Sequence, residues 1–218
     1  MKLVVFDVDG TLIDSQHHIH GAMTAAFEGA GLTPLPKEAV LQIVGLSLPV
    51  AVARLAAGQD AATQARIVEV YRSAFMQARM VQAAPLYPGA LDCLDRLGAR
   101  GDILLAVATG KSRRGLAAMI EAHGLAGRFV SLQTADDHPS KPHPAMLLSA
   151  LAETGVDAGD AVMVGDTSFD MEMAHAAVMT GLGVGWGYHA PEALTAAGAA
   201  FVAADFRALD QAVARWAA

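Results

Sequence analysis

Two aspartates stand two residues apart near the start of the chain, directly after a short apolar run. Asp7 and Asp9 follow residues 3–6 in the segment KLVVFDVDGT. The apolar run is typical of a buried strand, and open α/β sheets bind their ligands at the carboxyl ends of the strands. Two carboxylates at such a place repel each other unless a cation offsets their charge. Because Mg²⁺ prefers carboxylate and carbonyl oxygens, the spacing favours a magnesium site.

Further polar groups follow the later apolar runs. Thr109 and Gly110 offer a hydroxyl and backbone N–H groups near the start of an expected helix, an arrangement that suits an anion. Lys141, in the segment SKPHP, supplies a positive charge, and the flanking prolines stiffen its approach. Asp166 and Asp170, in GDTSFD, bring two more carboxylates to a strand end. Together these groups predict a catalytic site for an anionic substrate.

Six short apolar runs alternate with amphipathic segments, which is typical of a mainly parallel sheet with helices on both faces. The expected strands are 3–6, 103–108, 129–132, 161–164, 181–184 and 200–202. Residues 15–82 break the alternation, because they carry only helical patterning that glycines and prolines divide into about four helices. We therefore predict a Rossmann-like α/β core from residues 1–14 and 83–218, with a helical cap domain, 15–82, inserted after the first strand.

The four polar segments resemble, in order, the four motifs of the haloacid dehalogenase superfamily of phosphohydrolases. The matching residues are DVDGT from Asp7, then Thr109, Lys141 and GDTSFD from Gly165. The insertion is similar to the helical cap of one large subgroup, and the segments YPG, KPHP and GWGY are similar to those of phosphoglycolate phosphatases. Gly110 departs from the pattern, since many relatives carry asparagine there. The resemblance covers nearly the whole chain.

The resemblance implies a reaction in two steps. Asp7 would attack phosphorus and form an aspartyl-phosphate. Asp9 would protonate the departing alkoxide and then help to deprotonate the water that cleaves the intermediate. Mg²⁺ would be held by the Asp7 carboxylate, the backbone carbonyl of Asp9 and the Asp166 carboxylate.

The remaining motif residues are implied to bind the phosphoryl group. Thr109, the N–H of Gly110 and Lys141 would contact its oxygens and offset the charge that develops on them. Asp170 is expected at the edge of the site, where it orients Lys141 or a metal-bound water. The alternative for Asp170 is a helix cap or a surface acid.

These inferences favour a Mg²⁺-dependent phosphatase for a small phosphorylated metabolite, with 2-phosphoglycolate as the best single candidate. A pyrophosphatase and a sugar phosphomutase of the same superfamily are the alternatives. A 2-haloacid dehalogenase is disfavoured because halide displacement does not need Asp9 and Asp166. A phospho-accepting signalling module is disfavoured because such modules are shorter, lack a helical insertion and do not carry the phospho-accepting aspartate on the first strand.

Composition limits the partners. The 218 residues are 54% hydrophobic and 17% charged, with a formal net charge of −7. This charge argues against a general binder of nucleic acid or of anionic membranes. No run approaches the ~18 apolar residues of a membrane span, and the single cysteine, Cys93, fits a reducing cytoplasm. We expect a cytoplasmic monomer or homodimer that acts on a small molecule.

The single cysteine and a cluster of histidines are expected to have structural rather than catalytic roles. Cys93 lies on an apolar helix stripe and is expected to be a buried core thiol. His17, His18 and His20 have no carboxylate or cysteine beside them. We therefore expect these histidines to be solvated or packed in the cap rather than bound to a metal.

Two groups of polar residues could meet the substrate away from the reacting phosphate. Lys111, Arg113 and Arg114 follow the Thr109 motif and are expected on a solvated helix face, although one of them could meet a distal charge of the substrate. Ser47 and Arg54 lie in the predicted cap and are further candidates for substrate contact.

Overall fold

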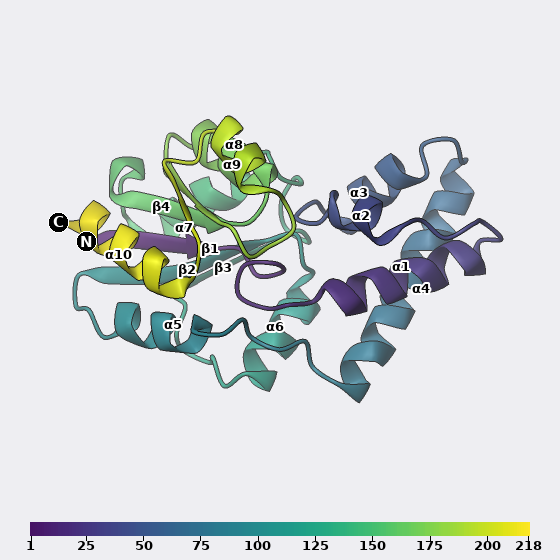
Figure 1. The fold of residues 1–218 in the computed structure, drawn as a ribbon, viewed down its shortest axis with the longest axis horizontal. Coiled ribbons are helices and arrows are strands. Elements are labelled where there is room, and N and C mark those ends of the chain that lie inside the picture. Colours follow the sequence, from purple (N-terminus) through teal and green to yellow (C-terminus); the bar gives the residue numbers. More distant parts are fainter.

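The computed structural model describes residues 1–218 and contains one six-stranded sheet with helices on both faces (Figure 1). The strands are β1 (Lys2–Phe6), β2 (Ile103–Thr109), β3 (Ser131–Thr134), β4 (Ala161–Gly165), β5 (Thr180–Val184) and β6 (Phe201–Ala203). All are parallel, in the order β3-β2-β1-β4-β5-β6. This arrangement confirms the predicted Rossmann-like α/β class.

The centre of the sheet is where the strand order reverses. β1 pairs with β2 on one side and with β4 on the other. In sheets of this type the crevice beyond the carboxyl ends of the strands at the reversal binds the ligand. The carboxyl ends of β1 and β4 are therefore the place where polar residues can act together.

Helices bury both faces of the sheet, which explains why its strands are continuous apolar runs. They are α5 (Ala90–Gly98), α6 (Arg113–Ala122), α7 (Ala145–Thr154), α8 (Ser168–Ala176), α9 (Pro191–Ala196) and α10 (Phe206–Ala217), with a 3₁₀ turn at Ala158–Asp160. Val4 and Phe6 share a buried cluster with residues of α5, α6 and α10. Leu3 and Val5 share a second cluster with residues of α7 and α8. No helix combines the length and hydropathy that a membrane crossing requires.

β3 lies two residues further along the chain than the predicted strand at 129–132. Its register pairs Ala106 with Ser131 and Thr109 with Thr134. The sheet edge is made of polar side chains, and the Gln133 amide donates a hydrogen bond of 2.7 Å to Ser131 Oγ. Val130, in contrast, is 55% exposed. The apolar pattern misplaced this strand because its buried positions are polar residues that satisfy one another.

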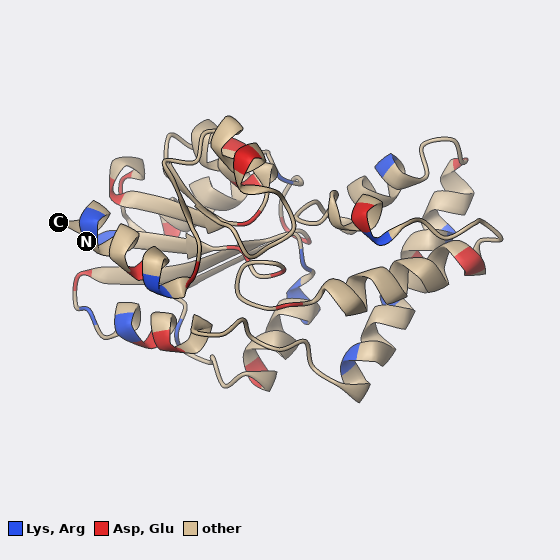
Figure 2. Cartoon of the chain, in the orientation of Figure 1, with Lys and Arg blue, Asp and Glu red and all other residues tan.

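Four helices occupy the segment between β1 and α5. They are α1 (Gln16–Gly29), α2 (Lys37–Leu41), α3 (Leu48–Leu55) and α4 (Ala61–Val81). They lie beyond the carboxyl ends of the strands, to the right in Figure 1, and have a hydrophobic cluster of their own that includes Met23, Phe27 and Ile67. Figure 2 shows Lys and Arg positions scattered over both parts of the chain rather than gathered on one face. The inserted helices therefore face the strand ends that carry the polar motifs.

Candidate active site

Asp7 lies at the end of β1 with its carboxylate buried, since the residue is 1% exposed. Neither carboxylate oxygen has a hydrogen bond of normal geometry. The positive charge in contact with it is the Lys141 ammonium, whose Nζ lies 2.8 Å from Oδ1. Burial raises the pKa of Asp7 to about 6, and Lys141 limits the rise. Asp7 is thus a buried carboxylate with lone pairs free for a ligand.

Lys141 joins two of the predicted acids. Its side chain is fully buried, and its Nζ lies 2.8 Å from Asp7 Oδ1 and 2.7 Å from Asp170 Oδ1. Burial alone would favour the neutral amine, but the charges of Asp170 and Asp7 outweigh it and raise the pKa of Lys141 above its ordinary value. The residue therefore supplies a fixed positive charge beside Asp7.

Asp166 lies at the end of β4 and is also fully buried. Its Oδ1 accepts a hydrogen bond of 2.8 Å from Thr11 Oγ1, and its Oδ2 accepts one of 2.9 Å from the Tyr188 N–H. Burial, with Asp7 and Asp170 nearby, raises the pKa of Asp166 well above its ordinary value. A Cβ at Gly10 would lie 2.2 Å from Asp166 Oδ2. Only glycine allows the first motif to approach Asp166 so closely.

Asp170 lies inside the carboxylate group, deeper than the edge position expected from the sequence, and it has no exposed surface. It belongs to the first turn of α8, where it forms a capping box with Thr167. Its Oδ2 accepts hydrogen bonds from the Thr167 N–H at 3.0 Å and from Thr167 Oγ1 at 2.7 Å. Its Oδ1 faces Lys141. The helix start thus fixes the carboxylate that orients the lysine.

Three carboxylates form a group that fits a divalent cation. Asp7, Asp166 and Asp170 each offer an oxygen, and these oxygens lie within 4.8 Å of one another. The donors are hard oxygens of the kind that Mg²⁺ prefers, and both Asp7 oxygens lack a hydrogen bond. The single lysine in contact with the group leaves negative charge to be offset. The residues present therefore fit Mg²⁺.

The Asp9 carboxylate is not part of this group and has partners of its own. Its carboxylate accepts a hydrogen bond of 2.6 Å from Ser15 Oγ and lies 2.8 Å from Lys111 Nζ. Lys111 is a correction to the sequence analysis, because its side chain is only 9% exposed and is not part of a solvated face. Arg113 does lie on that face, with a side chain 66% exposed that pairs with Asp137.

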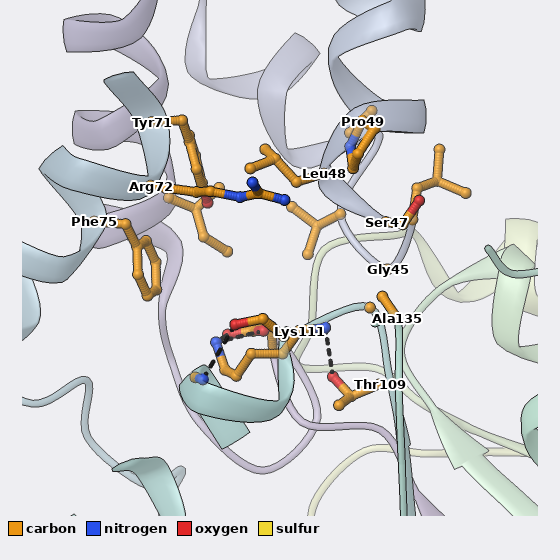
Figure 3. A pocket seen from close by; sticks show the side chains of 18 of the residues that line it. Gly45, Ser47, Leu48, Pro49, Tyr71, Arg72, Phe75, Thr109, Lys111 and Ala135 are labelled. Carbon is orange, nitrogen blue, oxygen red and sulfur yellow. Dashed lines mark hydrogen bonds and ion pairs between the residues drawn. The ribbon is translucent and has the colours of Figure 1, made fainter. Parts of the chain in front are cut away.

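Thr109 and Gly110 close the third side of the site, at the end of β2. Thr109 is buried, and its Oγ1 accepts a hydrogen bond of 3.2 Å from the Lys111 N–H (Figure 3). A Cβ at Gly110 would lie 2.6 Å from the carbonyl oxygen of Gly45. The inserted segment therefore rests on the Gly110 backbone, which explains why asparagine is absent here.

A cavity of about 350 Å³ opens above Asp7 and Asp9. The core lines it with Thr109, Gly110 and Lys111, and the insertion lines it with the loop 45–47, the start of α3 and α4. In Figure 3 the side chains of Tyr71 and Phe75 point down from α4 into the cavity, and that of Arg72 extends across it toward Leu48. A small molecule bound at Asp7 would therefore touch the inserted helices as well as the core.

Comparison with known proteins agrees with this geometry. The sequence model of the haloacid dehalogenase-like hydrolases matches residues 4–184. The chain belongs to this family. Membership confirms the resemblance indicated by the four motifs. In this hydrolase family the chain is similar to "Probable phosphatase IndB" of Dickeya dadantii, with 37% identity over 200 residues, 89% of this chain and 86% of that protein.

Two further relatives cover most of this hydrolase. A phosphoglycolate phosphatase of Rhodospirillum rubrum is 35% identical over 218 residues, which is 95% of this chain and 89% of that protein. The crystal structure of a hydrolase from Pseudomonas syringae has a TM-score of 0.89 with 24% identity and covers 100% of both chains. The likeness to the Pseudomonas syringae structure shows that the two chains share one fold over their whole length.

The other candidates of the sequence analysis lie around the site or away from it. His18 packs in the insertion, where its Nε2 lies 2.9 Å from the carbonyl oxygen of Gln82. Cys93 is fully buried, and burial raises the pKa of its thiol above the ordinary value. Ser47 lines the cavity. Arg54 instead lies over the Phe169 ring, 5.3 Å from its centroid.

Sequence reasoning missed four residues that the structure brings to the site. Tyr71, Arg72 and Phe75 line the cavity, and Ser15 donates a hydrogen bond to Asp9. Tyr71 and Phe75 carry a signal, since their four-residue spacing puts them on one face of a helix. That spacing does not say whether the face meets the core or solvent. Only the packing of α4 above Lys111 and the cavity decides it.

Proposed function

We propose that this hydrolase is a Mg²⁺-dependent phosphatase that cleaves a small phosphomonoester through an aspartyl-phosphate, with 2-phosphoglycolate as the favoured substrate. The enzyme is a phosphoric monoester hydrolase, the class in which its phosphatase relatives fall. One observation carries the finer proposal. Asp7 is buried at the floor of the cavity, and both of its oxygens are free of hydrogen bonds.

Asp7 acts as the nucleophile. One of its oxygens attacks phosphorus, the bond to the ester oxygen breaks, and Asp7 carries the phosphoryl group until water removes it. Asp9 gives a proton to the ester oxygen and later accepts one from the attacking water. The free lone pairs of Asp7 support this role, because a carboxylate held by several donors is a poorer nucleophile.

Lys141, Thr109 and the Gly110 N–H hold the phosphoryl oxygens. Catalysis of this transfer is mainly positioning and charge stabilisation, and Lys141 is held in place by Asp170 at 2.7 Å. Mg²⁺, held by the carboxylates of Asp7 and Asp166 and the backbone carbonyl of Asp9, offsets the charge of the phosphate when it is bound. Residues 15–82 act as a cap that keeps water from the site, since their loop at 45–46 rests on Gly110.

The cavity favours a substrate with a second anion. The arginines in ion pairs are Arg96, Arg100, Arg113 and Arg128. Arg72 and Arg79 of α4 and Arg114 of α6 instead line the cavity without a carboxylate partner. In a chain of net charge −7, three unpaired cations at the substrate cavity are a local site for an anion. The carboxylate of 2-phosphoglycolate is such a group, and the name of the Rhodospirillum rubrum relative supports the choice.

Phosphate release from a panel of substrates tests the proposal. The panel contains 2-phosphoglycolate, ethyl phosphate, a sugar phosphate, a nucleotide and pyrophosphate, each with Mg²⁺ or with excess chelator. We expect release only with Mg²⁺ and the highest kcat/KM for 2-phosphoglycolate. Release that continues in chelator, or a folded enzyme that cleaves only pyrophosphate, would overturn the proposal.

A further inference from the structure

The Asp9 carboxylate contacts two residues, Lys111 and Ser15, that have no role in the reaction proposed above. Lys111 Nζ lies 2.8 Å from Oδ1 and 2.8 Å from Oδ2 of Asp9, with the two side chains 9% and 13% exposed. Ser15 Oγ donates to Oδ1 at 2.6 Å. A charge-assisted contact to both oxygens fixes the plane of the carboxylate as well as its position. The rotation of Asp9 is therefore set by Lys111 together with Ser15.

Lys111 is itself held at both ends. Its N–H donates a hydrogen bond of 3.2 Å to Thr109 Oγ1, and its carbonyl oxygen accepts one of 3.2 Å from the Ala135 N–H. The backbone of Lys111 is thus tied to the end of β2 and to the segment after β3. The side chain of Lys111 therefore extends to Asp9 from a backbone that is held in place.

The insertion covers the ammonium. Lys111 Nζ lies 5.0 Å from the ring centroid of Phe75, which belongs to α4. Tyr71 stacks on Phe75 with a centroid distance of 5.8 Å. Figure 3 shows Phe75 above Lys111 on the cavity wall. A partly desolvated cation over an aromatic face is held there by electrostatic attraction. Phe75 therefore limits the paths by which the ammonium can leave Asp9.

We propose that Lys111 is a positioning residue that, held by Phe75, aims the Asp9 carboxyl group at the ester oxygen of the substrate. The inference rests on the proposed function, in which Asp9 is the proton donor. As the phosphoryl group passes to Asp7, the electron pair of the broken bond stays on the ester oxygen, which takes the proton from Asp9. An alkoxide needs this proton, whereas nitrophenolate leaves readily without it.

Three substrates separate this role from the others. Ethyl phosphate has a poor leaving group and an uncharged tail, 2-phosphoglycolate has a poor leaving group and an anionic tail, and p-nitrophenyl phosphate has a good leaving group. We expect Lys111→Met to lower kcat/KM about 30-fold for the first two, a part of the 10²–10⁴-fold that a general acid supplies. This ratio reports the steps up to the transfer of the phosphoryl group to Asp7 and leaves out the later hydrolysis, in which Asp9 also takes part. The kcat/KM for p-nitrophenyl phosphate should change less than about 3-fold, because its cleavage does not draw on that proton. Lys111→Arg should restore much of the lost kcat/KM.

Two further variants make the experiment specific. Arg113→Met removes a cation two residues away that pairs with Asp137 and does not contact Asp9, so it should change none of the three rates. Phe75→Leu should reproduce the same pattern with a smaller loss. Thermal unfolding of each variant checks that it is folded.

The outcomes are distinct. If Lys111→Met lowered kcat/KM equally for all three substrates, the inference would be overturned in favour of a structural role. A rise in KM for 2-phosphoglycolate alone would overturn it in favour of a lysine that binds the substrate's second anion. A wild-type enzyme that releases phosphate from none of the three would overturn the proposed function first, and this inference with it.

Discussion

Lys141 and Asp7 form an ion pair of 2.8 Å between Nζ and Oδ1, in which both side chains are almost completely buried. They are far apart in the sequence, and the parallel sheet brings them together. A buried charge is costly unless it is paired. The same contact therefore serves two purposes, since it holds the proposed nucleophile beside a positive charge and offsets the burial of both groups.

Removal of the lysine should damage activity and stability together. Lys141→Met takes a positive charge from the phosphoryl site and should lower kcat by about 10²–10³-fold. It also leaves Asp7 and Asp170 without their buried partner, which should cost about 3 kcal/mol of unfolding free energy. Phosphate release and urea unfolding measure the two effects.

Lys2→Met is the matched control. Lys2 pairs with Asp160 at 2.8 Å on the surface, where such a pair contributes less than about 1 kcal/mol. A Lys141→Met variant as stable and active as Lys2→Met would contradict the role of the buried pair.

Mg²⁺ should stabilise the folded chain even without substrate. Asp7, Asp166 and Asp170 lie together with one lysine, so a divalent cation relieves their repulsion only in the folded state. At about 100 times its dissociation constant, a ligand of the folded state adds about 2.7 kcal/mol. We expect the thermal midpoint to rise with Mg²⁺ in the wild type and much less in Asp166→Asn. An equal rise in both proteins would place the metal elsewhere.

Arg72 should contribute to recognition of the substrate's second anion. Arg72→Gln removes an unpaired cation from the cavity wall, and we expect the KM for 2-phosphoglycolate to rise about 10-fold, the value of one charged hydrogen bond. The KM for ethyl phosphate should stay within about 2-fold, since it has no second anion. Arg66→Gln, an exposed arginine of the same helix outside the cavity, is the control. A similar effect of both variants on both substrates would refute a specific contact.

The fit of the insertion on Gly110 should be sensitive to a single methyl group. A Cβ at Gly110 would lie 2.6 Å and 2.7 Å from the carbonyl oxygens of Gly45 and Leu46. Gly110→Ala should therefore displace the loop at 45–46 and lower kcat/KM about 10-fold or more. Gly101→Ala adds the same group where nothing lies within 4 Å, and it should have no effect on kcat/KM. If kcat/KM were unchanged in Gly110→Ala, the close contact between this loop and Gly110 would not be needed for activity.

The motifs could be recognised in the sequence because each one consists of residues that are neighbours along the chain. Asp7 follows an apolar run, and Asp166 follows another, so the end of a strand could be assigned to each from neighbouring residues alone. The depth of Asp170 could not be assigned in this way. It depends on the capping box of α8 and on Gly165, where a Cβ would lie 2.3 Å from Asp170 Cγ.

Residues that depend on the insertion were the hardest to predict. The cationic run that begins at Lys111 reads as a solvated helix face, and Arg113 follows that pattern. Lys111 departs from it because Phe75, from a helix far away in the chain, covers its ammonium. The predicted position of β3 was wrong for a related reason, because the buried residues of this strand are polar. Hydrophobic periodicity cannot report either case.

Rapid-quench analysis of the enzyme during turnover tests the central claim most directly. Enzyme mixed with saturating 2-phosphoglycolate and Mg²⁺ is denatured in acid, digested and examined by mass spectrometry for a phosphorylated aspartate. We predict a phosphate adduct on the peptide that contains Asp7, formed at a rate no slower than turnover, and neither adduct nor turnover in Asp7→Asn. Phosphate release at full rate with no adduct on Asp7, or turnover retained in Asp7→Asn, would contradict the account.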